Sequence, residues 1–289
     1  MIDIKCHSPA KINLFLYVTG RRPDGYHTLY SLMCRVKYGD TLEMTFGGED
    51  ITVGCNHQDV PGNQDNIVYK AASLFYSRLG QTPGVHIRIL KKIPVGAGLG
   101  GGSSNAASTF LALNRYYNSP FSREDLMTMG LSIGADVPFF IFEQTAIARG
   151  VGEQLESVEL PRSYKVLLVY PGIHVSTAEV YKKLNFKLTK DKKKNNNHIF
   201  CLPIGDLFSA RHLWNDLEAV TIKMVPEIEK IKGILMGYEA DGALMSGSGS
   251  SVFGLFSDEE KAMCAYDGIC SAKRAENTGW QVVLTELMI

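Results

Sequence analysis

A glycine-rich run at residues 94–104 constrains the fold more than any other part of the sequence, because five glycines fall within positions 96–102. Glycine lets a backbone approach a ligand closely and adopt conformations that side chains exclude. The run ends in Ser103 and Ser104 and is followed by Asn105, which predicts that it opens a helix. A helix N-terminus offers unpaired N–H groups and about half a positive charge, and both suit a phosphate. An ordinary turn is the alternative, but it rarely needs five glycines, so we predict a phosphate-binding loop.

Two well-known phosphate loops do not fit this run. Residues 96–101 match the G-x-G-x-x-G pattern of dinucleotide sites, which also needs an acidic residue at the end of the next strand, about 20 residues on. That region, residues 122–125, is instead typical of a capped helix start. The P-loop needs a lysine after its last glycine, whereas Gly102 is followed by Ser103. The loop is therefore of a third kind.

Composition narrows the class of protein. Thirty basic and thirty acidic residues cancel, so we expect no broad electrostatic surface for nucleic acid or an anionic membrane. Apolar runs such as residues 137–142 are too short to span a bilayer, and no apolar signal core precedes Pro9. Six cysteines lack metal-ligand or disulfide-like spacing, which predicts reduced thiols. These features predict a cytoplasmic protein that binds neither nucleic acid nor membrane.

The length of 289 residues favours two domains, which we expect at residues 1–155 and 156–289. Strands and helices that do not alternate regularly predict an α+β protein. The expected strands are residues 12–19, 41–46, 51–53, 85–89, 145–149, 165–170, 252–256 and 281–285, with 41–46 and 51–53 forming a hairpin. The expected helices start near residue 66, at the end of the glycine-rich run, and near residues 122, 176, 215, 226 and 258. The Lys- and Asn-rich residues 191–197 predict a solvated loop, with a phosphate-contacting patch as the alternative.

Three separated segments resemble motifs of the GHMP small-molecule kinases, named for galacto-, homoserine, mevalonate and phosphomevalonate kinases. They are residues 8–14, 94–104 and 245–254. Residues 10–27 and 133–140 are similar to the members of this family that phosphorylate a cytidine-diphosphate substrate in non-mevalonate isoprenoid synthesis. The resemblance implies a two-domain GHMP kinase fold, with an N-terminal domain like domain 2 of ribosomal protein S5 and a C-terminal ferredoxin-like α/β sandwich.

The resemblance also implies a reaction, in which the γ-phosphoryl group of ATP passes to the C2 hydroxyl of the cytidine-diphosphate substrate. Mg²⁺ would accompany ATP, although no paired carboxylates nominate its ligands. Asp136 would accept the hydroxyl proton, and Lys11 would keep that carboxylate ionised and stabilise developing charge. The alternatives are a helix N-cap for Asp136 and an ordinary strand lysine for Lys11. The oligomeric state is left open between a monomer and a homodimer.

The remaining predicted site residues follow from the same resemblance. ATP binding is assigned to Pro94, Val95, Gly96, Ala97, Gly98, Leu99, Gly100, Gly101, Gly102, Ser103, Ser104, Asn66 and Lys91. Substrate binding is assigned to Asn13, Tyr26, His27, Thr177, Tyr181, Gly247, Ser248 and Gly249. Helix capping is the alternative for Asn66, a surface position for Lys91 and core packing for Tyr181.

Two other functions compete with this one. A homoserine or mevalonate kinase would share the three motifs, but the aromatic pair Tyr26 and His27 suits a nucleobase better than either acceptor. A non-catalytic ATP-binding sensor would be favoured by loss of Asp136 or Lys11, and both are present.

Overall fold

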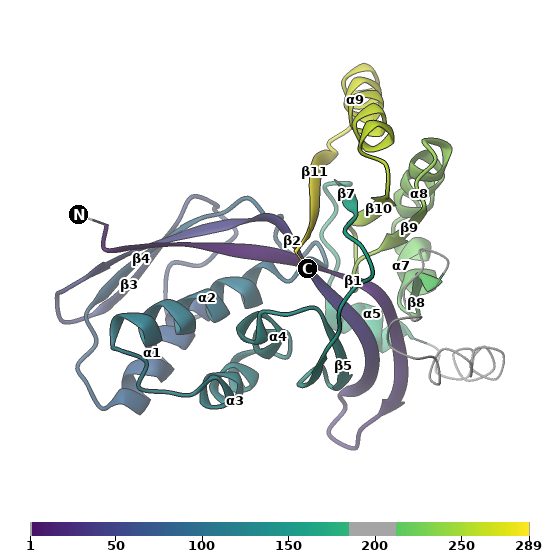
Figure 1. Ribbon diagram of the computed structural model, residues 1–289. Coiled ribbons are helices and arrows are strands. Elements are labelled where there is room, and N and C mark those ends of the chain that lie inside the picture. Colours follow the sequence, from purple (N-terminus) through teal and green to yellow (C-terminus); the bar gives the residue numbers. More distant parts are fainter. Residues whose placement is uncertain (1, 185–211, 289) are drawn as a thin grey trace. The chain divides into compact units, whose positions relative to one another are not determined.

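The computed structural model describes residues 2–184 and 212–288 (Figure 1). The Lys- and Asn-rich residues 191–197 lie outside these described residues. The chain forms two compact units, each discontinuous in sequence. Unit 1 comprises Met1–Ala10, Tyr38–Val95 and Gly100–Gln144, and unit 2 comprises Lys11–Lys37, Gly96–Leu99 and Thr145–Ile289. The units are discontinuous because two long strands, β1 (Ile4–Arg21) and β2 (His27–Phe46), each contribute to both. The expected division after residue 155 stays a prediction.

Unit 1 contains helices on one face of a small sheet (Figure 1). Its further elements are β3 (Ile51–Cys55), α1 (Ile67–Leu79), β4 (Val85–Leu90), α2 (Gly101–Tyr116), α3 (Arg123–Ile133) and α4 (Val137–Phe142). Strand β4 pairs antiparallel with residues 41–46 of β2 and parallel with β3. The expected hairpin between residues 41–46 and 51–53 is therefore wrong, because β4 lies between the two strands.

Local signals set the helix ends of unit 1. The side chain of Asn66 accepts a hydrogen bond from the N–H of Val68 at the start of α1, and Gly80 ends that helix with a left-handed φ of 70°. Ser122 and Asp125 form the reciprocal hydrogen bonds of a capping box at the start of α3. This confirms that residues 122–125 begin a helix and do not end a strand.

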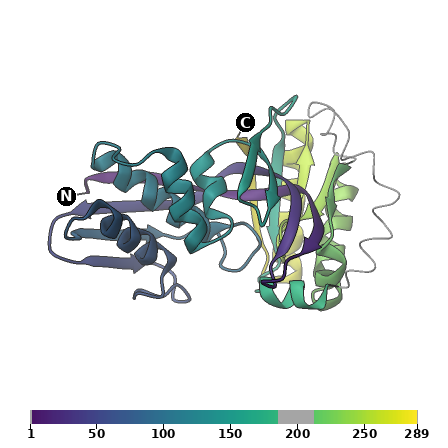
Figure 2. The ribbon, with the colours of Figure 1, turned by 90° about the horizontal axis from the view of Figure 1, so that it is seen from below.

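Unit 2 combines an antiparallel sheet with helices that pack beside it (Figure 2). Its elements are β5 (Ala146–Gly150), β6 (Gln154–Ser157), β7 (Lys165–Tyr170), α5 (Thr177–Lys183), β8 (Trp214–Asn215), α7 (Glu218–Met224), α8 (Glu227–Gly237), β9 (Gly242–Met245), β10 (Val252–Phe256), α9 (Glu259–Glu276) and β11 (Gln281–Met288). The strands run in the order β9–β10–β7–β11, and the end of β11 pairs with Arg35 and Val36 of β2. The α+β prediction is confirmed.

The hydrophobic core of unit 2 joins the sheet to its helices, through side chains such as Phe256 in β10 and Ile231 in α8. One expectation fails here, because Trp214 and Asn215 pair in parallel with Phe15 and Leu16 of β1. The helix expected from about residue 215 therefore begins only at Glu218. Among residues 2–184 and 212–288, the helices are all too short or too polar to span a bilayer.

Candidate active site

The glycine-rich loop at residues 96–99 turns its carbonyl groups toward the rest of unit 2. The carbonyl oxygens of Gly96, Ala97, Gly98 and Leu99 accept hydrogen bonds at 3.0–3.5 Å, in that order from Val175 N, Ser251 N, Ser246 Oγ and Lys11 N. In the part of the chain that the structure describes, none of the four N–H groups of the loop donates to a protein acceptor. The acceptors are therefore engaged by protein, and the donors remain available for an anion.

The backbone conformation of the loop suits the same ligand. Gly96, Gly98 and Gly100 have left-handed φ values of 65°, 78° and 69°, and they alternate with Ala97 and Leu99, which do not. Alternation of this kind curls successive N–H groups into a concave anion-binding nest. Helix α2 follows directly, with Gly100 as an N-cap that makes no side-chain hydrogen bond. The first N–H groups of α2, which belongs to unit 1, lack acceptors within the helix and by themselves also suit an anion.

A second glycine-rich turn, residues 246–251, packs against this loop. A Cβ atom on Gly98 would overlap the carbonyl oxygen of Ser246 and lie 2.9 Å from the N atom of Gly249. A Cβ atom on Gly247 would lie 2.9 Å from the carbonyl oxygen of Gly98. Asn215 fixes the turn by donating to the carbonyl oxygen of Gly247 at 2.7 Å. Gly247 and Gly249 thus pack against the loop, and their contact with substrate stays a prediction.

Lys11 is the first donor in a series of hydrogen bonds between buried polar side chains of unit 2. Its ammonium donates to Oδ1 of Asn13 at 2.7 Å, and Nδ2 of Asn13 donates to Oγ of Ser31 at 2.8 Å. The hydroxyl of Ser31 donates in turn to the carbonyl oxygen of Phe15. Lys11 is only 5% exposed, so the alternative of an ordinary strand lysine with its ammonium in water is wrong. The chain fixes the position of the ammonium.

Asp136 lies in unit 1, directly before the short helix α4. It occupies the N-cap position, with Pro138 in the first turn, but its carboxylate makes no capping hydrogen bond. The capping alternative therefore does not explain this residue. Lys11 and Asp136 belong to different units, so their pairing stays a prediction. Within the described ranges, no cluster of three or more His, Cys, Asp or Glu residues could hold a metal ion.

Two of the three residues predicted to bind the nucleobase, His27 and Tyr181, contact each other. The rings of His27 and Tyr181 stack with centroids 4.9 Å apart and planes at 23°. Tyr181 reaches His27 from α5, which Ser176 caps as the sequence predicts. Tyr26 is 63% exposed beside them. Burial, with a smaller contribution from the charge of Arg21, lowers the pKa of His27, so its imidazole is neutral at physiological pH.

Two further predicted substrate residues contact each other. The hydroxyls of Thr177 and Ser248 lie 2.8 Å apart, within hydrogen-bond distance. Thr177 is the first residue of α5, and Ser248 belongs to the second glycine-rich turn. This bond connects the helix that carries Tyr181 to the turn that supports the phosphate loop.

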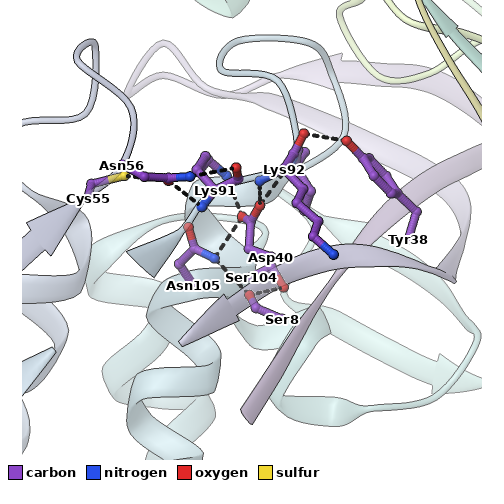
Figure 3. Close-up of polar contacts among 10 residues, drawn as sticks. Ser8, Tyr38, Asp40, Cys55, Asn56, Lys91, Lys92, Ser104 and Asn105 are labelled. Carbon is purple, nitrogen blue, oxygen red and sulfur yellow. Dashed lines mark hydrogen bonds and ion pairs between the residues drawn. The ribbon is translucent and has the colours of Figure 1, made fainter. Parts of the chain in front are cut away.

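Asn66 and Lys91, the two outlying residues of the predicted ATP site, have different surroundings. Asn66 caps α1 and also donates to the carbonyl oxygen of Pro61, so both polar atoms of its side chain have a structural partner. The ammonium of Lys91 forms a buried ion pair with Asp40 (Figure 3). The surface alternative for Lys91 is wrong, since its side chain is only 5% exposed. Contact of either residue with ATP stays a prediction.

Sequence reasoning missed Asp40 and Asn215, which fix the surroundings of the two glycine-rich turns. Asp40 lies in β2 between apolar residues such as Val36 and Leu42. An acidic residue is seldom buried without a partner. The position of Asp40 among strand residues that face the core is therefore the signal that could have predicted a buried carboxylate with a partner.

Comparison with known proteins identifies the family of this chain. Residues 66–144 match the family described as GHMP kinases N terminal domain, and residues 204–273 match GHMP kinases C terminal. Solved structures include a 4-(cytidine 5'-diphospho)-2C-methyl-D-erythritol kinase, 32% identical with a TM-score of 0.76, covering 99% of this chain and 100% of that one. A homoserine kinase from Cytophaga hutchinsonii shares the fold, with a TM-score of 0.79 at 19% identity over 97% of this chain and 93% of its own. The predicted GHMP kinase fold is thus confirmed.

Curated relatives identify the branch of the family. The 4-diphosphocytidyl-2-C-methyl-D-erythritol kinase of Syntrophus aciditrophicus is 46% identical, over 90% of this chain and 92% of its own length. The kinase of the same name from Pelobacter propionicus is 42% identical over the whole of both chains. The chain described here therefore belongs to the 4-diphosphocytidyl-2-C-methyl-D-erythritol kinases, a branch of the GHMP kinase family.

Proposed function

We propose that this chain transfers the γ-phosphoryl group of ATP to the C2 hydroxyl of 4-diphosphocytidyl-2-C-methyl-D-erythritol, a step of non-mevalonate isoprenoid synthesis. The observation that carries the ATP site is the loop at Gly96–Leu99, whose four carbonyl groups bond to protein while its N–H groups do not. Membership of the family supports the choice of acceptor. A cytoplasmic location, as a monomer or a homodimer, fits this reaction.

Asp136 is the proposed general base. As the C2 oxygen attacks the γ-phosphorus, the carboxylate accepts the hydroxyl proton and ADP leaves with the electrons of the broken phosphorus–oxygen bond. Lys11, whose ammonium donates to Asn13, stabilises the negative charge that develops on the transferring phosphoryl group. The acceptor carbon is fully substituted, so orientation of its hydroxyl matters more than for a primary alcohol.

Mg²⁺ would neutralise charge on the ATP phosphates. This ion is commonly held by one or two carboxylates, substrate phosphates and waters. A hydroxyl of the glycine-rich run, such as that of Ser103, is the candidate protein ligand.

The cytosine ring would be recognised by Tyr26, His27 and Tyr181. An aromatic ring stacks on a base for about 1–3 kcal/mol, and the neutral imidazole of His27 can both donate and accept at the base edge. His27 and Tyr181 already contact each other, so a base held between them requires one ring to move. Thr177 and Asn13 complete the proposed acceptor site, with Ser248 behind Thr177.

The test is ADP release by the purified protein with the cytidine-diphosphate acceptor, mevalonate and homoserine offered separately. We expect release only with the first. Asp136→Asn keeps the size of the side chain and removes the base, so turnover should fall about 100-fold or more. Both substrates should still bind and the fold should stay intact, because asparagine has the size of the aspartate that it replaces. Near-normal turnover in Asp136→Asn or Lys11→Met, with all substrates bound, would contradict these roles.

A further inference from the structure

Asp40 is a fully buried carboxylate whose two oxygens accept four hydrogen bonds (Figure 3). Oδ1 accepts from the backbone N atoms of Lys92 at 2.7 Å and Ile93 at 2.8 Å. Oδ2 accepts from the ammonium of Lys91 and from Nδ2 of Asn105 at 2.9 Å. All five residues belong to unit 1. A carboxylate with four donors around it is fully satisfied, and burial of its charge is thereby compensated.

These donors come from both ends of the glycine-rich run. Lys92 and Ile93 precede the run, and Asn105 follows it in the first turns of α2. Asp40 therefore fixes where the chain enters the phosphate loop and where it leaves. Many glycines make the loop itself conformationally permissive, so the loop depends on anchors at its ends for a defined shape.

A second connection secures the exit side. Nδ2 of Asn105 also donates to the hydroxyl of Ser8 in β1 at 2.9 Å, and that hydroxyl donates to Oγ of Ser104 at 2.8 Å. Ser8, Ser104 and Asn105 are all buried. Through Asn105, Asp40 thus connects β2 to the start of α2 and to β1.

The negative charge of Asp40 also holds the ammonium of Lys91 close to the start of α2. A Cβ atom on Gly101 would lie 2.6 Å from Nζ of Lys91, so the ammonium rests against the first residue of α2. A cation at a helix N-terminus is repelled by the positive end of the helix dipole. Asp40 offsets this repulsion, and without its negative charge the buried ammonium would leave its place.

We infer that Asp40 is a positioning residue for nucleotide binding. It holds the two ends of the phosphate loop at a set separation and keeps Lys91 at the start of α2, so that the loop is preorganised before ATP arrives. The inference rests on the proposed ATP role of the loop. It adds a residue that touches neither the nucleotide nor the reacting atoms.

Asp40→Asn tests this role. One amide oxygen can still accept from Lys92 and Ile93, but the amide NH₂ would face the donors of Lys91 and Asn105. We expect the dissociation constant for a non-hydrolysable ATP analogue, measured by calorimetry, and the KM for ATP to rise at least 10-fold. The KM for the cytidine-diphosphate acceptor and kcat should change less than twofold. Glu43→Gln is the matched control, because Glu43 is a buried acid of the same strand that pairs with Lys5 and Arg88 instead. Its ATP affinity should not change.

The double variant Asp40→Asn with Lys91→Met separates positioning from stability. Removing the unpaired ammonium should restore the melting temperature. ATP affinity should stay at least 10-fold weaker than in Lys91→Met alone, which measures any direct contribution of Lys91 to ATP binding, because the contact of Asp40 with Asn105 is still lost. Recovery of both, or a lower melting temperature with unchanged ATP affinity in Asp40→Asn, would overturn the inference. A wild type that binds the ATP analogue but phosphorylates no cytidine-diphosphate acceptor would contradict the proposed function alone, since calorimetry needs no acceptor.

Discussion

The replacement Gly98→Ala tests whether contact between the two glycine-rich turns shapes the phosphate loop. The new methyl group would overlap the carbonyl oxygen of Ser246 and crowd the N atom of Gly249. It would also sit on a residue with φ of 78°, a conformation that disfavours any side chain. The loop must therefore move away from the second turn or change its backbone conformation.

The expected size of the effect follows from two contributions. A left-handed conformation costs a residue other than glycine about 1–2 kcal/mol. Separation of the turns would also break the bond from Ser246 Oγ to the carbonyl oxygen of Gly98, worth about 1 kcal/mol. Together they cost about 2–3 kcal/mol in the binding-competent loop, so the dissociation constant for ATP should rise roughly 30- to 140-fold.

Gly80→Ala is the matched control, because Gly80 has a similar φ of 70° but open space where its Cβ would stand. It should lower the melting temperature slightly and leave ATP affinity unchanged. Calorimetric titration with a non-hydrolysable ATP analogue measures both variants. If Gly98→Ala binds the analogue as tightly as Gly80→Ala does, the second turn does not shape the phosphate loop.

Two further predictions concern titratable groups. Burial lowers the pKa of His27 below its ordinary value of 6.5, so as the pH falls the unfolded chain takes up this proton before the folded one does. The melting temperature should therefore fall as the pH drops below about 6.5. His27→Gln should lack that part of the pH dependence, and identical plots of melting temperature against pH for the two proteins would contradict a lowered pKa of His27. Burial also raises the pKa of the Cys34 thiol to about 12, so alkylation at pH 8 followed by mass spectrometry should label the exposed Cys264 and leave Cys34 unlabelled unless the protein is denatured.

Local signals in the sequence predicted local structure well. Asn66 and Gly80 bound α1 because the hydrogen bonds of a cap involve residues only a few positions away. The hairpin across residues 41–53 failed for the opposite reason. Turn residues between the strands indicated pairing, but β4, more than 30 positions further along the chain, inserts between them.

In the candidate site, too, features set by neighbouring residues could be predicted from the sequence, and features set by distant residues could not. The glycine count predicted a phosphate loop, since the left-handed backbone at Gly96, Gly98 and Gly100 requires that residue type locally. The surroundings of Lys91 could not be read in this way, because its partner Asp40 is 51 positions away and is brought close only by the paired strands β2 and β4. The rings of His27 and Tyr181 stack although the two residues are 154 positions apart, about half of the chain. Only resemblance to a known family suggested that they act together.

The pairing of β2 with β11 sets a limit on how this chain can be made. Val36 pairs with Leu287 in β11, the last strand of the described residues, so the partner of Val36 is synthesised 251 residues later. At about 5–20 residues per second, a ribosome needs roughly 13–50 s to cover that distance. Throughout this interval Arg35 and Val36 of β2 lack this strand partner, and an open strand edge invites pairing with other chains. Unit 2 can therefore complete its sheet only after nearly the whole chain has been made, and its yield in the cell should depend on what shields the early strands.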